Sequence, residues 1–344
     1  MCRFNDSYID TEQFFTTSLH ILTCFEIPIH TFGTYIILYK TPKEMDGVKI
    51  SLLIYHLIFA FTDILNSFFL MPYFFPPIAT GKCLGFLTYI GVPPAPQGYL
   101  SLIAISHTGA SLILFFENRY TALVHGRYIS KNRKRFRVIY VGGNYLFTLT
   151  YCLPVFLNFP DPELARIHMK TLLPCLPDTV VDLLYPQTIA IDITVLSVLI
   201  TIVTITNTSQ FSFLVFLTFS FFNSAAGSAK LSEATKKLQK KFYIALVIQS
   251  SIPMIVIVLP ACYMCYSFWN TYFNQGYNNI SFIFFSMHGL ASTIAMLLIH
   301  RPYREATFEI LVPVCILDRI QQKYTVASAE TSMNSVISVR SNTY

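Results

Sequence analysis

Charged residues are scarce in this chain. Asp, Glu, Lys and Arg make up 12% of its 344 residues, while hydrophobic residues make up 53% and the mean hydropathy is +0.52. A soluble domain usually carries about 25% charged residues, which keep its surface hydrated. The shortage of charge excludes a water-soluble globule of this size and predicts an all-α integral membrane protein.

Recognisable catalytic signatures are also missing. There is no HExxH, GxSxG or P-loop motif. Cys262 and Cys265 have CxxC spacing, but they lie in an apolar run without His. We therefore predict that they are packing residues, that there is no metal or cofactor site, and that the protein is not an enzyme.

Several other roles lack support. The net charge of +6 comes from short basic runs between apolar segments rather than from a basic face, which argues against nucleic-acid binding. No series of intramembrane carboxylates indicates a pump or channel, and no internal repeat indicates a transporter. The first 15 residues hold one Arg and three acidic residues, the wrong charge for a cleavable signal. We expect the first apolar span to be an uncleaved anchor.

What the chain does contain is a series of apolar segments of about twenty residues, each enough to cross a hydrocarbon core of about 30 Å. They lie at roughly 18–39, 50–74, 98–116, 138–159, within 188–223, 242–268 and 280–299. Two short spans within 188–223 would make eight, but no charged hinge interrupts that segment. We therefore favour one long helix there and a bundle of seven.

Lys and Arg are distributed unevenly between the two sides of such a bundle. With the N-terminus outside, 20 of the 24 fall in inner segments, and positive residues concentrate on the cytoplasmic side of membrane proteins. We predict an extracellular tail at 1–17, a membrane domain at 18–299 and a cytoplasmic tail at 300–344. The last contains a short amphipathic helix at 302–311 and a disordered end.

The outer segments contain two features typical of an oxidising, glycosylating compartment. Asn5 begins a glycosylation sequon. Cys83 and Cys175 fall in the first and second outer loops, so we favour a disulfide between them. Cys2 would compete if the tail folds back, and two free thiols are the alternative.

Polar residues inside the spans require partners. Glu26 and His30 lie one turn apart on the first span, His56 and Asp63 lie on the second, and Gln249 lies on the sixth. A charge at mid-membrane costs about 2.5 to 3.5 kcal/mol unless it faces the bundle interior. Asp63 is expected either to form a coupling or ion site, or to make an inter-helix hydrogen bond.

The third apolar segment ends at Glu117-Asn118-Arg119-Tyr120, ahead of a basic loop. We predict that Arg119 pairs with a carboxylate, Glu117 or Glu233, and that this ion pair holds the third and sixth helices together as a switch. A simple anchor at the membrane interface is the alternative.

Several short motifs follow one another along the chain. They are Thr41-Pro42-Lys43-Glu44-Met45, His56 with Asp63, Pro72, Phe116-Glu117-Asn118-Arg119-Tyr120, Leu238-Gln239-Lys240-Lys241-Phe242, Gln249, Pro253 with Pro260, and His300-Arg301-Pro302-Tyr303-Arg304. From about Ile27 to Arg304, the chain resembles the nematode serpentine chemoreceptors of class H, a branch of the seven-helix, rhodopsin-like G-protein-coupled receptors. The sibling class I shares several of these motifs.

The resemblance implies a chemosensory receptor, placed among the lipids of the plasma membrane of sensory neurons, at the ciliary membrane. It implies a small-molecule cue and a heterotrimeric G protein as partners, and it allows a receptor oligomer. Residues expected to serve G-protein coupling are Glu117, Asn118, Arg119, Tyr120, Pro302, Tyr303 and Arg304. Position alone nominates a ligand pocket at His107, Tyr263, Trp269 and His288. A seven-span ligand-gated channel or a transporter is the alternative function.

Overall fold

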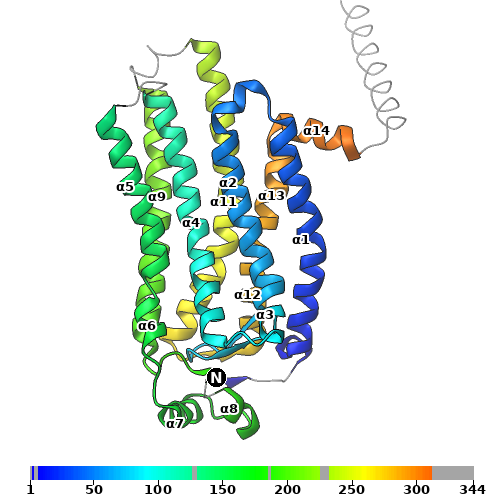
Figure 1. Cartoon of the computed structure of the whole chain (residues 1–344), viewed down its shortest axis with the longest axis vertical. Helices are drawn as coiled ribbons and strands as arrows, with labels where there is room; N and C mark the ends of the chain where they lie inside the picture. Colours follow the sequence, from blue (N-terminus) through cyan, green and yellow to red (C-terminus); the bar gives the residue numbers. More distant parts are fainter. Residues whose placement is uncertain (1, 4–6, 126–129, 185–186, 225–231, 312–344) are drawn as a thin grey trace, which may run out of the picture.

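The chain folds into a bundle of long helices, seen in a computed structural model that describes residues 2–3, 7–125, 130–184, 187–224 and 232–311. The long helices run side by side along one axis (Figure 1). They are α1 (Glu12–Lys40), α2 (Asp46–Ile64, continued by a π-helical turn at Leu65–Leu70), α4 (Pro94–His125), α5 (Lys131–Thr150), α9 (Ile193–Asn223), α11 (Glu233–Trp269), α12 (Gln275–Ser286) and α13 (His288–Ile299).

Six of these helices are long and apolar enough to cross a membrane, and the pair α12 and α13, bent by 44°, makes a seventh span if counted together. The segment 193–223 is one helix, as the sequence predicts. α11 also continues through Pro253 and Pro260 as one helix. The protein is therefore a mostly helical, multi-pass membrane protein.

Several helices begin at a polar residue whose side chain caps the first turn. Thr11 accepts from Phe14 N in α1, Ser130 from Arg133 N in α5, and Ser232 from Thr235 N in α11. Such caps satisfy main-chain N–H groups that have no partner within the helix. α5 and α11 consequently extend into their basic flanks, beyond the apolar segments seen in the sequence.

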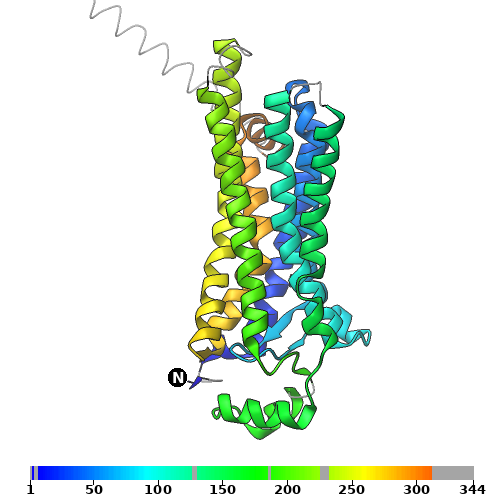
Figure 2. The same cartoon turned by 90° about the vertical axis from the view of Figure 1, so that its left-hand side faces the viewer.

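The two ends of the bundle differ. At one end, called the hairpin end below, β2 (Pro72–Phe74) and β3 (Gly81–Cys83) form an antiparallel hairpin. At the same end, β1 (Cys2–Arg3) pairs parallel with β4 (Phe273–Asn274). Short helices also lie at this end: η1 (Tyr8–Asp10), α3 (Phe86–Tyr89), α6 (Leu153–Leu157), α7 (Pro162–Leu172) and α8 (Asp178–Leu184). At the opposite, basic end, η2 (Lys43–Met45) joins α1 to α2, and α14 (Arg301–Leu311) runs sideways from the end of α13, past α1 (Figure 1). Figure 2 shows α7 and α8 projecting beyond the other helices.

α1 begins at Glu12, inside the segment 1–17 that the sequence predicts to be a tail. Ile9 and Asp10, just before it, contact the hairpin end. Tyr73 Oη donates to Asp10 O at 2.8 Å, and Asn279 Nδ2 donates to Ile9 O at 2.8 Å. Asn5, the predicted glycosylation site, lies outside the described residues.

The predicted disulfide between Cys83 and Cys175 is wrong. Cys83 is a free thiol, whereas Cys175 is disulfide-bonded. Cys83 belongs to β3, and its side chain is buried rather than exposed on a loop. Burial raises the pKa of its thiol to about 12. Cys262 and Cys265 are both free thiols.

Candidate functional site

An apolar cavity of about 160 Å³ lies among α4, α9 and α11, in the half of the bundle nearer the hairpin end. The turn between β2 and β3 contributes Pro76, Ile78 and Ala79 to its wall. Other lining residues include Ile105, Gly109, Leu112, Ile200, Val203, Asn207, Met254, Ile257, Met264 and Phe285. The cavity is suited to a small, mostly apolar molecule.

None of the four residues predicted to form the pocket lines this cavity. His107 Nδ1 lies 2.8 Å from Ile103 O, and the ring is directed towards α5. Tyr263 donates to Asn278 at 2.8 Å, and Trp269 is 62% exposed at the end of α11. Depth in the bundle does not determine which face of a helix a residue occupies, so position alone did not lead to this cavity.

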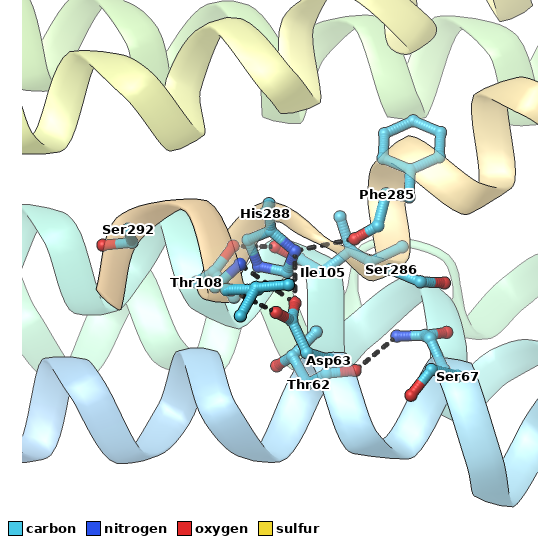
Figure 3. A network of polar contacts seen from close by, with 12 residues as sticks. Thr62, Asp63, Ser67, Ile105, Thr108, Phe285, Ser286, His288 and Ser292 are labelled. Atoms are coloured by element: carbon cyan, nitrogen blue, oxygen red, sulfur yellow. Dashed lines mark hydrogen bonds and ion pairs between the residues drawn. The ribbon is translucent and has the colours of Figure 1, made fainter. Parts of the chain in front are cut away.

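The fourth residue, His288, belongs to a buried network around Asp63 (Figure 3). The carboxylate of Asp63 accepts from Gly289 N at 3.0 Å and from Leu290 N at 2.6 Å. It therefore caps the first turn of α13, at the break after Met287. His288 Nδ1 lies 2.9 Å from Asp63 and 2.7 Å from Phe285 O. Because a carbonyl oxygen only accepts, Nδ1 carries the hydrogen.

The remaining interior polar residues also join neighbouring helices. Ser67 Oγ donates to Glu26, linking α1 to the end of α2. His30 Nδ1 lies 3.0 Å from Thr293 Oγ1, and its Nε2 lies 3.5 Å from Asp63. His56 Nε2 lies 3.1 Å from the main-chain oxygen of His30. These contacts connect α1, α2 and α13 through polar groups inside the bundle.

Gln249 also joins neighbouring helices, nearer the basic end. Its Oε1 lies 2.7 Å from His300 Nε2, and both side chains are buried. This contact connects α11 to the junction of α13 and α14.

The predicted ion pair of Arg119 is wrong, because Glu117 binds two arginines of α5 instead. Arg133 Nη2 lies 3.0 Å and Arg137 Nε 2.7 Å from the buried Glu117 carboxylate. Arg137 also donates to Asn118. Residues two apart in a helix point to different faces, so Glu117 faces α5 while Arg119 does not.

Arg119 instead lies over the ring of Phe242 on α11, with Cζ 4.6 Å from the ring centroid. The alternative partner, Glu233, is exposed and forms no ion pair with Arg119 in the part of the chain that the structure describes. Arg119 also lines a groove of about 680 Å³ at the basic end. Other lining residues are Leu123, Phe222, Gln239, Tyr243, His300 and Pro302.

Of the other predicted coupling residues, Pro302 lines this groove, whereas Tyr120, Tyr303 and Arg304 do not. Tyr120 is partly buried on α4. Tyr303 is buried on α14, and its hydroxyl lies 3.0 Å from Thr41 Oγ1. Burial raises the pKa of Tyr303. Arg304 donates to Leu298 O at 3.1 Å, so α14 is attached to both α1 and α13.

Comparison with known proteins identifies the family. A model of the serpentine type 7TM GPCR chemoreceptors, Srh, matches residues 10–313. The chain belongs to this family. It is also 24% identical over 320 residues to Serpentine receptor class H-72 of Caenorhabditis elegans, covering 92% of this chain and 89% of that protein. The resemblance to class H is confirmed, and a receptor family agrees with the expectation of a protein that is not an enzyme.

Sequence reasoning missed the true partners of Glu117 in this receptor, although a signal was present. Arg133 and Arg137 are four residues apart, so they share one face of α5 and can approach one carboxylate together. The break between α12 and α13 had no comparable local signal, because the group that caps it belongs to α2.

Proposed function

We propose that this receptor binds a small external chemical cue in the apolar cavity and activates a heterotrimeric G protein at the basic end. The observation that carries the proposal is that three helices, α4, α9 and α11, line both sites, with α9 contributing Asn207 to the cavity and Phe222 to the groove. α4 contributes residues 102–112 to the cavity and Arg119 to the groove, while α11 contributes residues 254–268 to the cavity and Phe242 to the groove.

A ligand in the cavity can then change the groove by favouring one arrangement of α4 and α11. It can shift that equilibrium only as far as its affinities for the two arrangements differ. The contact between Arg119 and Phe242 joins these helices without a buried ion pair, so separating them leaves no carboxylate unpaired. Arg119 would then be released to meet the G protein.

The experiment uses Arg119→Ala in cells that express the receptor with a promiscuous G protein. An agonist is first found by screening small volatile and lipid-like compounds against the unaltered receptor. We expect Arg119→Ala to reach the surface and to lose G-protein activation. Arg135→Ala is the matched control, because Arg135 is exposed on α5 at the same end and does not line the groove. Normal signalling by Arg119→Ala at equal surface abundance would remove Arg119 from the mechanism.

The proposal requires the N-terminus and the hairpin end to be outside the cell. The bias of 20 of 24 Lys and Arg towards the other side supports this orientation. An epitope tag within residues 127–137 should be inaccessible to antibody until cells are permeabilised. Staining of intact cells would overturn the orientation, and with it the signalling face. The ciliary membrane of sensory neurons is the site proposed from the family.

A further inference from the structure

One polar side chain in the cavity wall has an unused hydrogen-bond acceptor. Asn207 lies midway along α9, and its Oδ1 is buried with no hydrogen-bond partner among the described residues. Three other polar residues of the wall donate to carbonyl oxygens of their own helices: Ser106 to Leu102, Thr108 to Ile105, and Thr204 to Ile200. A buried acceptor without a donor is unfavourable, so a bound molecule that supplies one gains affinity.

The position of Asn207 depends on a glycine of α4. A Cβ added at Gly109 would collide with Asn207 Nδ2 and would lie 2.8 Å from Asn207 Cγ. Only the missing side chain at Gly109 lets the carboxamide approach the α4 backbone so closely. The nitrogen lies against α4, and the oxygen is left available.

We propose that the cavity selects a small, mostly apolar molecule with one hydroxyl group, which donates to Asn207 Oδ1. A cavity of about 150 Å³ accommodates a molecule of the size of benzene, so this cavity, of about 160 Å³, suits a phenol or a cyclic alcohol. A protonated amine would also donate, but it would place a charge in apolar surroundings. This inference rests on the proposed function, because it takes the cavity as the ligand site.

The test compares 4-fluorophenol with 4-fluorotoluene, which differ by a hydroxyl in place of a methyl group. Binding to the full chain in lipid nanodiscs is followed by ¹⁹F NMR, with empty nanodiscs as the correction for partition into lipid. We expect the phenol to bind about 10 to 100 times more tightly than the toluene. In Asn207→Leu this preference should disappear, while binding of 4-fluorotoluene persists and shows that the variant is folded.

Asn144→Leu is the matched control. Asn144 lies on α5, exchanges two amide hydrogen bonds with Gln210 on α9, and does not line the cavity. It should keep the preference for the phenol. If Asn207→Leu does not fold, Asn207→Ala provides the same comparison.

The outcomes separate this inference from the proposed function. Equal binding of both probes to the unaltered receptor, or a preference that survives Asn207→Leu, would overturn the role of Asn207 and leave the cavity as the ligand site. Binding of neither probe, together with Arg119-dependent signalling by some other compound, would overturn the hydroxyl specificity and leave the signalling role intact. Binding of neither probe, together with no Arg119-dependent signalling by any compound, would overturn both this inference and the proposed function.

Discussion

Replacing Asp63 by Asn should measurably weaken the bundle, although the two side chains have nearly the same shape. The carboxylate accepts two main-chain N–H bonds, at 3.0 and 2.6 Å, and a third contact from His288. A carboxamide has one oxygen, and its NH₂ group would face a donor. One buried donor therefore loses its acceptor, which costs about 1 to 3 kcal/mol. At about 2 °C per kcal/mol, the Tm should fall by roughly 2 to 6 °C.

The assay is thermal unfolding of the purified receptor in one detergent, followed by loss of the monodisperse peak. Asp192→Asn is the matched control, because Asp192 caps α9 by accepting from Thr194 N at 2.9 Å, but in an exposed position. Asn caps helices as well as Asp does, so we expect the control to unfold at the same temperature as the unaltered chain. Equal Tm values for Asp63→Asn and the unaltered chain would refute the reasoning, as would an equal decrease in the control.

Two further predictions concern residues where the structure differs from the sequence-based expectation. Glu117→Gln should lower the Tm, because both α5 arginines lose a buried charged partner. Glu309→Gln is the control and should leave the Tm unchanged, because the Lys40–Glu309 pair is exposed and 4.0 Å apart. Equal Tm values for the two variants would contradict this prediction. Peptide mapping without reduction should find Cys175 in a disulfide. Cys83 should be alkylated only after unfolding, because its thiol is buried and burial raises its pKa to about 12. A peptide joining Cys83 to Cys175 would disprove the assignment.

The main features of the fold could be predicted because each depends on a local property of the sequence. Apolar runs longer than a bilayer requires appear as helices, including the uninterrupted α9. The buried state of Glu26, His56 and Asp63 followed from the cost of exposing polar groups to lipid. These arguments need no knowledge of which helices are neighbours.

Partners across the bundle could not be predicted in the same way. The break before His288 is stabilised by Asp63, more than 200 residues earlier, so no pattern near the break reveals it. The cavity depends on which faces of α4, α9 and α11 meet. By contrast, the spacing of Glu117 and Arg119 alone could have warned against pairing them, because residues two apart do not share a helix face.

The cap on α13 has a consequence for how the chain is made. Asp63 and Gly289 are 226 residues apart. At roughly 5 to 20 residues per second, the ribosome needs roughly 10 to 45 s to travel between them. During that interval α2 holds a carboxylate whose final partners have not been synthesised. His30, which is 3.5 Å from it in the finished bundle, belongs to the preceding helix and is already present. His30 on α1 is thus the partner available to Asp63 until α13 has been synthesised.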